Sequence, residues 1–386
     1  MRRVCIIGVG MTEFRHRPES IQDIGAQAIK LAFDEVKNLE LKDIQAVYCG
    51  TMGGGPSLAS RIMARCKDVM GQEGLTGVPM SNWENMCVSG TNAIMAAYLD
   101  IASGLHDIVL QVGVEKLGRG SLAQGKDGRL TTAKFKGPPP APAMFAGQAK
   151  RHMKRFGTTR EHLAMVAVKS KEYASRNPNA QYRKKVTIDE VLNSKMIAEP
   201  LTMLMCCPTS TGGSSVIFCA EDIARKYQDT LVEFVASSMK TCRAKVPTLE
   251  SGWDPNIRAG RESYKRAGIG PTDIGVAQVH DCFAIAELMH YESFGFCDMG
   301  KSGEWIEDGG PTKDGEVPVN TDGGLISKGH PLGATGGAQF YELTNQLRGT
   351  AHTQIKPIPE YALQHNMGGG VGVGMAYVCN ILKRLR

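Results

Sequence analysis

The sequence lacks the patterns that mark several common classes of protein. No apolar run is long enough to cross a bilayer, so we expect no membrane-spanning segment. The eleven cysteines follow no regular spacing, and neither a CxxC pair nor an HExxH motif occurs. Spaced cysteines mark disulfide scaffolds, and those two motifs mark many metal sites. We therefore expect reduced thiols and no bound metal.

The sequence also has no signal-peptide pattern, because Met1–Gly8 leads at once into an apolar, β-branched run. Together with reduced thiols, this favours a cytoplasmic protein. The formal net charge is only +6, which suits a small anionic ligand and does not indicate nucleic acid. A dinucleotide-binding loop is not expected either, since Glu13 stands where the motif that begins at Gly8 and Gly10 needs a third glycine.

Strand and helix patterns alternate along most of the 386 residues, a length that favours two domains or a duplicated unit. This alternation predicts an α/β fold with a parallel or mixed sheet whose faces are covered. Strands are expected at 4–9, 46–50, 107–114, 214–220, 231–237, 276–280 and 361–378, and helices at 21–39, 57–70, 91–105, 255–267 and 284–294.

Residues 116–204 interrupt this alternation. Glycine- and proline-rich loop signals come first, and helix patterns follow at Ala143–Phe156 and Thr159–Asn177. The segment is therefore interpreted as an insertion over the α/β core. Its basic residues form either a solvated helix face or a cradle for a phosphorylated ligand. They are Arg129, Lys134, Lys136, Lys150, Arg151, Lys154, Arg155, Arg183, Lys184 and Lys185.

Cys87 stands between a polar stretch and the helix pattern 91–105. A cysteine at the start of a helix meets free backbone N–H groups and the positive end of the helix dipole. Both favour the thiolate, which is the nucleophilic form, so the pKa of Cys87 is predicted to be lowered. The alternative is a buried structural cysteine.

Three further segments place polar or titratable residues at corners bounded by glycines or helices: His280–Phe283, Gly329–Gly336 and His365–Gly370. Such corners bring backbone N–H groups close to a ligand. A nucleophilic cysteine, a histidine that takes its proton, and N–H groups that hold an oxyanion are what acyl transfer requires. The layout around Cys282 also echoes that around Cys87, which indicates an internal duplication.

Together and in this order, these segments resemble the thiolase superfamily over essentially the whole chain. Asn85–Gly90 is similar to its nucleophile segment, and Asn320–Gly336 is similar to its catalytic-histidine loop. His280–Phe283 and His365–Asn366 resemble the sterol-carrier-protein-type and archaeal-type thiolases. In that group the last loop lacks the second catalytic cysteine that the common thiolases carry.

The resemblance implies a role for single residues. Cys87 would attack the thioester carbonyl and carry the acyl group, and His330 would take the proton of Cys87. Cys282 would be the acid and base of the second half-reaction, which calls for a pKa near neutral. His280 and His330 would form one oxyanion hole, and the N–H groups of Cys87 and Gly368 would form a second. The substrate would be bound by Met144, Phe145, Asn366 and Met367.

The resemblance also implies an architecture and partners. The fold would be the thiolase fold, with two similar βαβαβαββ halves in a layered α-β-α-β-α core. Residues 1–115 and 205–240 would form the first half, 116–204 an inserted loop domain over the substrate, and 241–386 the second half. We expect a homodimer or tetramer, coenzyme A as a substrate, and no permanently bound cofactor. A small zinc-ribbon/OB-fold (DUF35-like) protein subunit is a further expected partner.

The predicted function is the CoA-dependent cleavage of a 3-oxoacyl-CoA, or the reverse Claisen condensation, through an acyl-cysteine. Acetoacetyl-CoA is the default substrate. The rival is a bulkier or carboxylated 3-oxoacyl-CoA such as benzoylsuccinyl-CoA, which the basic insertion and the unusual segment Thr211–Ser215 favour. One alternative is a non-catalytic thiolase-like subunit of an acyl-CoA-handling complex. Another is a ketoacyl or 3-hydroxy-3-methylglutaryl-CoA synthase, against which Cys282 argues.

Overall fold

A continuous mixed sheet runs through the computed structural model, which describes residues 2–124, 130–133, 136, 140–243, 248–370 and 373–385. One half of the sheet contains, in spatial order, β1 (Val4–Met11), β9 (Thr211–Ala220), β4 (Ile108–Lys116), β2 (Ala46–Gly50) and β3 (Met80–Trp83). The other half contains β10 (Val232–Thr241), β13 (Val373–Arg384), β12 (Tyr361–Gly370) and β11 (Ile274–Gln278). The halves join where Val4–Ile6 of β1 pair with β10.

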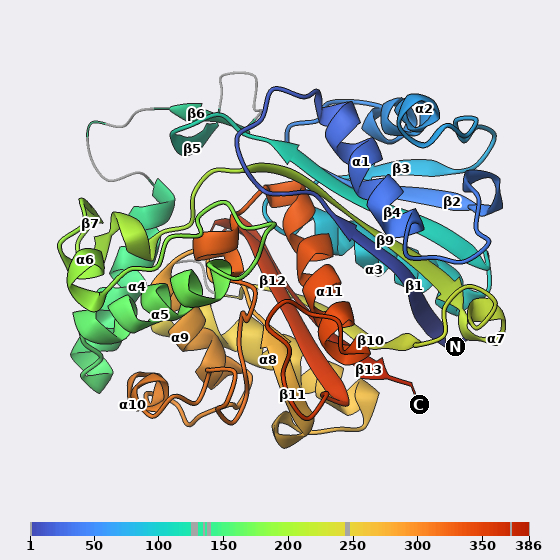
Figure 1. Cartoon of the computed structure of the whole chain (residues 1–386). Coiled ribbons are helices and arrows are strands. Elements are labelled where there is room, and N and C mark those ends of the chain that lie inside the picture. Colours follow the sequence, from blue (N-terminus) through green and yellow to red (C-terminus); the bar gives the residue numbers. More distant parts are fainter. Residues whose placement is uncertain are drawn as a thin grey trace.

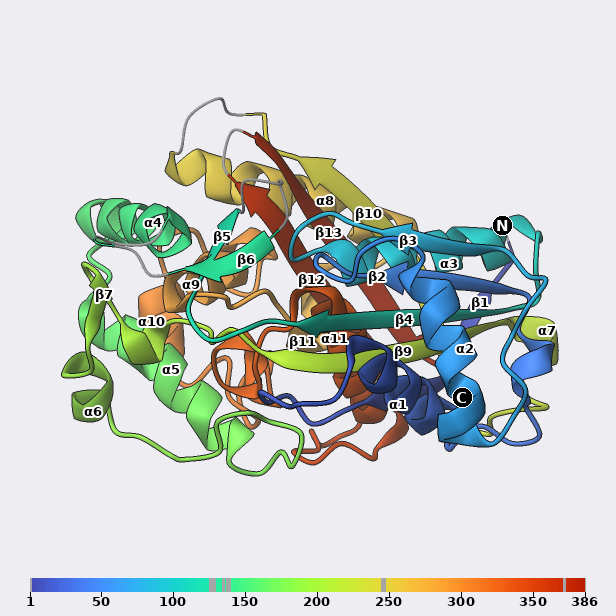
Figure 2. The same cartoon turned by 90° about the horizontal axis from the view of Figure 1, so that it is seen from above.

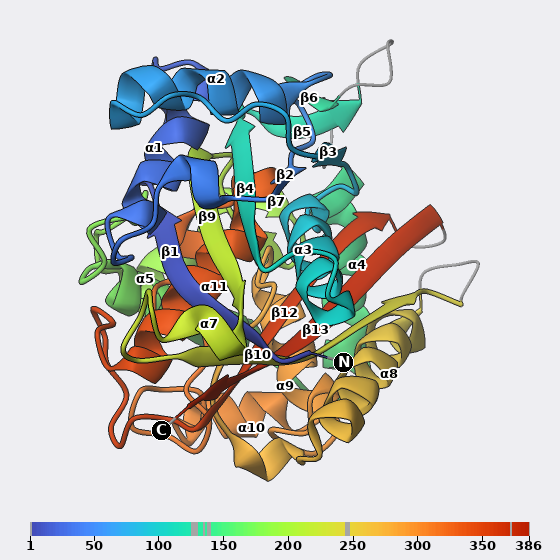
Figure 3. The ribbon, with the colours of Figure 1, turned by 90° about the vertical axis from the view of Figure 1, so that its right-hand side faces the viewer.

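Helices lie between the two halves of the sheet and cover their outer faces (Figures 1 and 3). The middle layer is α3 (Ser89–Ser103) with α11 (Leu332–Arg348). The first half is covered by α1 (Ile21–Phe33) and α2 (Leu58–Met70), and the second by α8 (Leu249–Ala267) and α9 (Ala284–Ser293). The predicted α-β-α-β-α order of an α/β thiolase fold is therefore confirmed.

The two middle helices are buried over most of their length, and in α11 almost every residue is buried. Ile94 and Ala97 of α3 pack in one buried cluster with Phe340 of α11 and with Phe218 and Phe234 of the strands. The buried polar side chains of α11 have partners, since Gln339 donates to the His365 carbonyl at 3.0 Å and Gln346 to the Thr353 carbonyl at 2.7 Å. Apolar packing and satisfied hydrogen bonds together allow the helix to lie between the sheets.

Glycines let these two helices meet at their first turns. A Cβ atom on Gly90 would lie 2.2 Å from the Gly333 carbonyl oxygen, and one on Gly336 would lie 2.3 Å from Thr91 Oγ1. Any side chain at either position would push the helices apart. Because Cys87 precedes α3 and His330 precedes α11, this contact brings both residues to one place. The internal duplication suggested by the similar layouts around Cys87 and Cys282 stays a prediction.

Between β4 and β9 the chain leaves the sheet and builds most of one end of the molecule (Figure 2). Helices and hairpins form this excursion: β5 (Ser121–Gln124), β6 (Leu130–Ala133), α4 (Pro140–Phe156), α5 (Arg160–Ala174), α6 (Ile188–Leu192), β7 (Met196–Ala198) and β8 (Leu201–Thr202). Short helices α7 (Glu221–Ala224) and α10 (Ser302–Glu307) lie elsewhere in the chain. Within the described ranges, no helix combines the length and apolarity that a bilayer crossing requires.

The basic residues of the excursion are mostly on its solvent side. Lys150, Arg151, Lys154 and Arg155 of α4 are exposed, as are Lys136 and the run 183–185, which favours the solvated-face interpretation for them. Arg129 and Lys134 lie outside the described residues. The proposed boundary at residue 240 falls at the end of β10, although β10 pairs along its length with β13 of the second half.

Candidate active site

Cys87 lies on a sharp turn that leads into α3. Met86 has a φ of 51°, a left-handed conformation that is uncommon for a residue with a side chain. The Ser89 hydroxyl holds this turn, because it accepts from the Asn85 N–H at 2.8 Å and donates to the Met86 carbonyl at 2.6 Å. Such strain is found mainly at functional sites. The turn presents the half-buried Cys87 just ahead of the helix.

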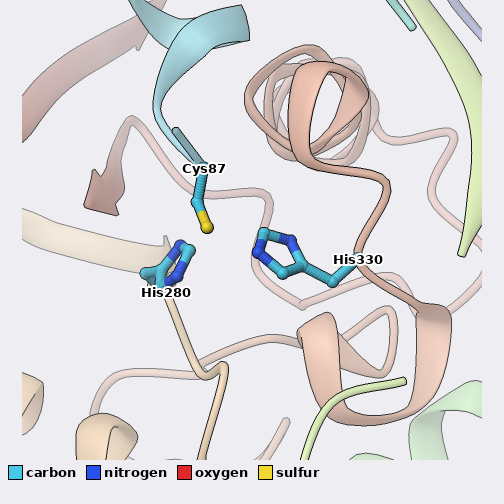
Figure 4. Close-up of side chains that lie close together, drawn as sticks. All are labelled: Cys87, His280 and His330. Atoms are coloured by element: carbon cyan, nitrogen blue, oxygen red, sulfur yellow. The ribbon is translucent and has the colours of Figure 1, made fainter. Parts of the chain in front are cut away.

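Three side chains from distant segments converge at this turn: Cys87, His280 and His330 (Figure 4). The Cys87 Sγ atom and one nitrogen of each ring all lie within 4.8 Å of one another. The two rings stand almost perpendicular, at 83°, with centroids 5.1 Å apart. By donor type the set could also ligate a soft divalent ion such as Zn²⁺. The structure thus assembles one thiol and two imidazoles predicted from three separate motifs.

Hydrogen bonds fix which nitrogen of His330 carries the proton. The Thr335 hydroxyl donates to the Pro331 carbonyl at 2.9 Å, so its oxygen must accept from His330 Nδ1–H at 2.7 Å. The His330 backbone N–H donates to Ser210 Oγ at 2.9 Å and anchors the loop. Nε2 therefore bears a lone pair, and among the described residues it has no hydrogen-bond partner. This nitrogen is poised to accept a proton.

The resting site is electrically neutral, which differs from the prediction of a thiolate. Burial raises the pKa of the Cys87 thiol to about 12, and the nearby Glu115 adds to the shift. Burial also lowers the pKa of His330 well below its usual value and that of His280 to about 3. The loss of hydration thus raises the pKa of Cys87 by more than the helix N-terminus can lower it. Cys87 needs a base to become nucleophilic, and the neutral His330 is available.

His280 is oriented by a second group of buried side chains. Its backbone N–H donates to His365 Nδ1 at 3.4 Å, and His290 Nε2–H donates to the His280 carbonyl at 3.2 Å. Asn366 donates from Nδ2 to Thr91 Oγ1 at 3.1 Å, which ties the last loop to the first turn of α3. His365 and Asn366 thus position the site, although sequence reasoning assigned only Asn366 to the substrate.

Gly368 packs directly on the Cys87 turn. A Cβ atom there would lie 2.9 Å from the Cys87 backbone nitrogen and 2.7 Å from that of Val88. These backbone N–H groups include one predicted oxyanion donor. The absence of a side chain at 368 is therefore a geometric requirement of the turn.

A Gly368→Ala variant is expected to lose about 10²- to 10³-fold in kcat, because the methyl group must displace the N–H donors at the Cys87 turn. Steady-state thiolysis kinetics would measure the loss. Gly369→Ala is a poor control because Gly369 has a φ of 105°, so Ala376→Gly, opposite Gly368 on β13, is the matched variant. Wild-type kcat in Gly368→Ala would contradict this geometry.

Cys282 lies beside the three-residue cluster, in the buried core. Burial raises its pKa well above the usual value, and the Cys207 and Cys87 thiols add to this shift. The prediction of a pKa near neutral is therefore wrong for the resting site. Cys207, which sequence reasoning missed, donates from its N–H to the Cys282 carbonyl at 2.9 Å. Its only sequence signal was its adjacency to Pro208–Ser215, the segment that departs from the family.

Buried carboxyl groups support the corners around the site. Asp281 accepts from the N–H groups of Leu325 and Ile326 at 2.7 and 3.3 Å and so holds the approach to His330. Glu115 accepts from Gly333 N–H at 3.2 Å, at the first turn of α11, and burial raises its pKa to about 7. Sequence reasoning noticed neither carboxyl as a support, because their partners are far away in the chain.

A large cavity of about 1170 Å³ opens at His330. Its walls come from the excursion, from the segment that contains Cys206–Thr209, and from Phe283. A second, small cavity of about 20 Å³ is lined by Met144, Phe145 and Met367, three of the four residues predicted to bind substrate. Phe145 stacks on Phe283 with centroids 4.7 Å apart, so the two cavities share a wall.

The buried histidines predict how stability depends on pH. His280 and His290 have pKa values lowered to about 3, and those of His330 and His365 lie well below 6.5, in each case because of burial. Below pH 6.5 the unfolded chain therefore binds protons that the folded chain does not. Each histidine lowers the unfolding free energy by about 1.4 kcal/mol per pH unit of acidification.

Buried carboxyl groups oppose this effect over part of the range. The pKa values of Glu115 and Glu342 are raised to about 7 and that of Asp281 to about 8 by burial, so the folded chain binds extra protons down to about pH 4.5. Four histidines against three carboxyl groups leave about one proton taken up on unfolding, so we expect the unfolding free energy from urea titrations to fall by only about 1.4 kcal/mol per pH unit between pH 6.5 and 4.5 and several times faster below. A His290→Gln variant should fall less steeply. A steep fall already between pH 6.5 and 5 would contradict this balance.

Comparison with known proteins decides the family. A model of the thiolase N-terminal domain matches residues 4–222, and a thiolase C-terminal domain-like model matches residues 246–384. The chain belongs to the thiolase family. Its relatives include proteins named acetyl-CoA acetyltransferase and thiolase, so this thiolase is an acyltransferase enzyme.

Relatives of this thiolase include the variant group expected from its motifs. It is 37% identical to the acetyl-CoA acetyltransferase of Methanothermobacter thermautotrophicus over 98% of this chain and 99% of that one. It is 36% identical to sterol carrier protein 2 of Gallus gallus, over 96% of this chain and 71% of that one. The benzoylsuccinyl-CoA thiolase subunit BbsB of Thauera aromatica is 33% identical, with 96% and 95% covered. The predicted resemblance is thus confirmed.

Solved structures agree. The Ltp2–ChsH2(DUF35) aldolase has a TM-score of 0.82 at 25% identity, over 99% of this thiolase and 98% of that chain. Human mitochondrial 3-ketoacyl-CoA thiolase in complex with CoA has a TM-score of 0.72 at 18% identity, over 100% and 98%, which shows the shared fold.

Proposed function

We propose that this thiolase interconverts a 3-oxoacyl-CoA plus coenzyme A with two acyl-CoA molecules, through an acyl group on Cys87. The observation that carries the proposal is the neutral His330 ring, whose unpartnered Nε2 lies in a cluster with the Cys87 sulfur. A thiol beside an oriented, unprotonated imidazole is the arrangement that nucleophilic catalysis requires.

In the first half-reaction the Cys87 sulfur attacks the thioester carbonyl as His330 Nε2 takes the thiol proton. The oxyanion is held by His280, His330 and the N–H groups of Cys87 and Gly368. When the carbon–sulfur bond to CoA breaks, His330 returns the proton to the CoA thiolate. The first turns of α3 and α11 both face this point, so their dipoles stabilise the developing negative charge.

In the second half-reaction the Cys282 thiol passes its proton to His330 Nε2, and the resulting thiolate removes a proton from the α-carbon of another acyl-CoA. The enolate attacks the acyl-cysteine, a carbon–carbon bond forms, and the released Cys87 thiolate recovers its proton from His330. A thiolate with a raised pKa is a strong base, which suits the weakly acidic α-proton. Thiolysis runs the same steps in reverse, with coenzyme A as a substrate.

Acetoacetyl-CoA is the first candidate substrate. It is supported by the acetyl-CoA acetyltransferase of Methanothermobacter thermautotrophicus, which is 37% identical to this thiolase over nearly the full length of both chains. A carboxylated substrate such as benzoylsuccinyl-CoA is the second candidate, supported by the relative BbsB. A DUF35-like zinc-ribbon/OB-fold subunit is proposed as a partner of a cytoplasmic homo-oligomer, because the aldolase neighbour is a complex with such a protein.

A thiolysis screen across 3-oxoacyl-CoA esters, with and without the DUF35-like subunit, tests the proposal. We expect cleavage of at least one ester, with an acyl adduct on the peptide that contains Cys87 by mass spectrometry. A chain that cleaves none of them and forms no adduct would instead be a non-catalytic subunit. Full activity of one purified polypeptide would count against the partner.

A further inference from the structure

Lys171 is a buried cation for which the described part of the chain supplies no counter-ion. It lies on α5 with 4% of its surface exposed, and its ammonium sits 4.6 Å from the centre of the Tyr182 ring. The neighbouring Glu172 pairs with Lys185 and Arg176 instead. Burial alone lowers the pKa of Lys171 to about 8, which agrees with the lack of a nearby carboxylate.

Other cations near Lys171 have partners. Lys169, two residues before Lys171 on α5, pairs with Glu287 at 2.6 Å and donates to the Val319 carbonyl. Lys184 lies 3.6 Å from Glu190, and both line the large cavity. Buried charges are normally paired because removal from water is costly. Lys171 is therefore the exception in this region.

The Lys171 side chain lines the same cavity as His330. Tyr182, Gln181 and Ile326 lie along the wall with them, and backbone bonds from Gln181 to Lys328 and from Tyr182 to Ser327 fix this wall to the His330 loop. At about 1170 Å³ the cavity can hold a large thioester. One ligand in this cavity can thus reach both His330 and the unpaired Lys171 ammonium.

We propose that Lys171 binds an anionic oxygen group of the thioester substrate, either a carboxylate at the end of the acyl chain or a phosphate of coenzyme A. Tyr182 covers the ammonium and holds it in place through a cation–π contact. The proposal rests on the proposed function, in which this cavity receives an acyl-CoA. It adds a residue that none of the motifs indicated and narrows the substrates to those that carry the matching charge.

Equilibrium binding of unreactive thioethers tests this role without any turnover. The probes are S-pentyl-CoA, its ω-carboxy counterpart, and the same two groups on pantetheine, which lacks the nucleotide phosphates. Titration calorimetry on the full chain compares wild type with Lys171→Met, and Lys185→Met is the matched control on an exposed lysine. We expect a 10- to 100-fold rise in Kd for the probes that carry the recognised anion.

The two sources of the anion give different patterns. If Lys171 recognises the acyl carboxylate, Lys171→Met should bind both ω-carboxy probes more weakly and both pentyl probes as well as wild type does. If Lys171 recognises a phosphate, the variant should bind both CoA probes more weakly and both pantetheine probes as well as wild type does. Lys171→Arg should recover part of the affinity. Lys171→Met should keep or raise the thermal midpoint, because it removes an uncompensated charge.

Unchanged Kd values for all four probes in a folded Lys171→Met protein would overturn the proposal. Equal weakening of all four would overturn it as well, since it would reveal a purely structural role. These measurements need no thiolysis, so a chain that proves inactive in the substrate screen would still give an answer on Lys171.

Discussion

Cys87→Ala is expected to lower kcat/KM for thiolysis by about 10⁵-fold, because no other group can carry the acyl intermediate at the turn before α3. Stopped assays of 3-oxoacyl-CoA consumption would measure this loss. Since the thiol is small and half-buried, the unfolding free energy should change by less than about 1 kcal/mol. Cys297→Ala, at a half-buried thiol outside the cavity, is the matched control.

The protonation state of Cys87 gives a second readout for the same residue. With a pKa raised to about 12, the resting thiol should react slowly with iodoacetamide at pH 7. If Cys87→Ala retained a tenth of the wild-type rate and carried an acyl adduct elsewhere, the nucleophile would be another cysteine. Cys207 would then be the first candidate.

His330→Gln is expected to lower the rate of Cys87 acylation by about 10³- to 10⁴-fold. An amide cannot accept the thiol proton, and the Cys87 thiol cannot ionise unaided in so dry a site. Rapid-quench measurement of the acyl-enzyme in a single turnover isolates this step from the condensation that follows.

Thr335→Val separates orientation of the His330 ring from basicity. It keeps the imidazole but removes the acceptor of Nδ1–H, so the proton can move to Nε2. We expect an intermediate loss of about 10-fold or more, with a changed pH dependence of acylation. A His330→Gln protein that acylates within tenfold of wild type would assign the base to His280.

The sequence was sufficient to predict which residues meet, but not their ionisation states. Cys87, His280 and His330 stand in short motifs with recognisable neighbours, and alternating strand and helix patterns predicted the layers. The pKa of Cys87 depends on how completely the surrounding elements exclude water, which no local pattern records. For that reason the helix-start argument predicted the wrong direction.

Supporting residues escaped prediction for a related reason. Cys207 approaches Cys282 because the chain returns from the excursion to meet the corner after β11, a contact across 75 positions. Lys171 resembles any other lysine of an amphipathic helix until the fold shows that its carboxylate neighbour Glu172 faces another way. Both roles depend on long-range packing rather than on residue type.

The glycine contact between α3 and α11 separates chemistry from selectivity in this molecule. Two of the reacting groups, Cys87 and His330, are set by two helix ends that touch through main-chain atoms. The outer wall of the cavity, in contrast, comes largely from the segment between β4 and β9. Evolution could therefore change which acyl chain is accepted by altering that segment alone, while the catalytic residues stayed the same.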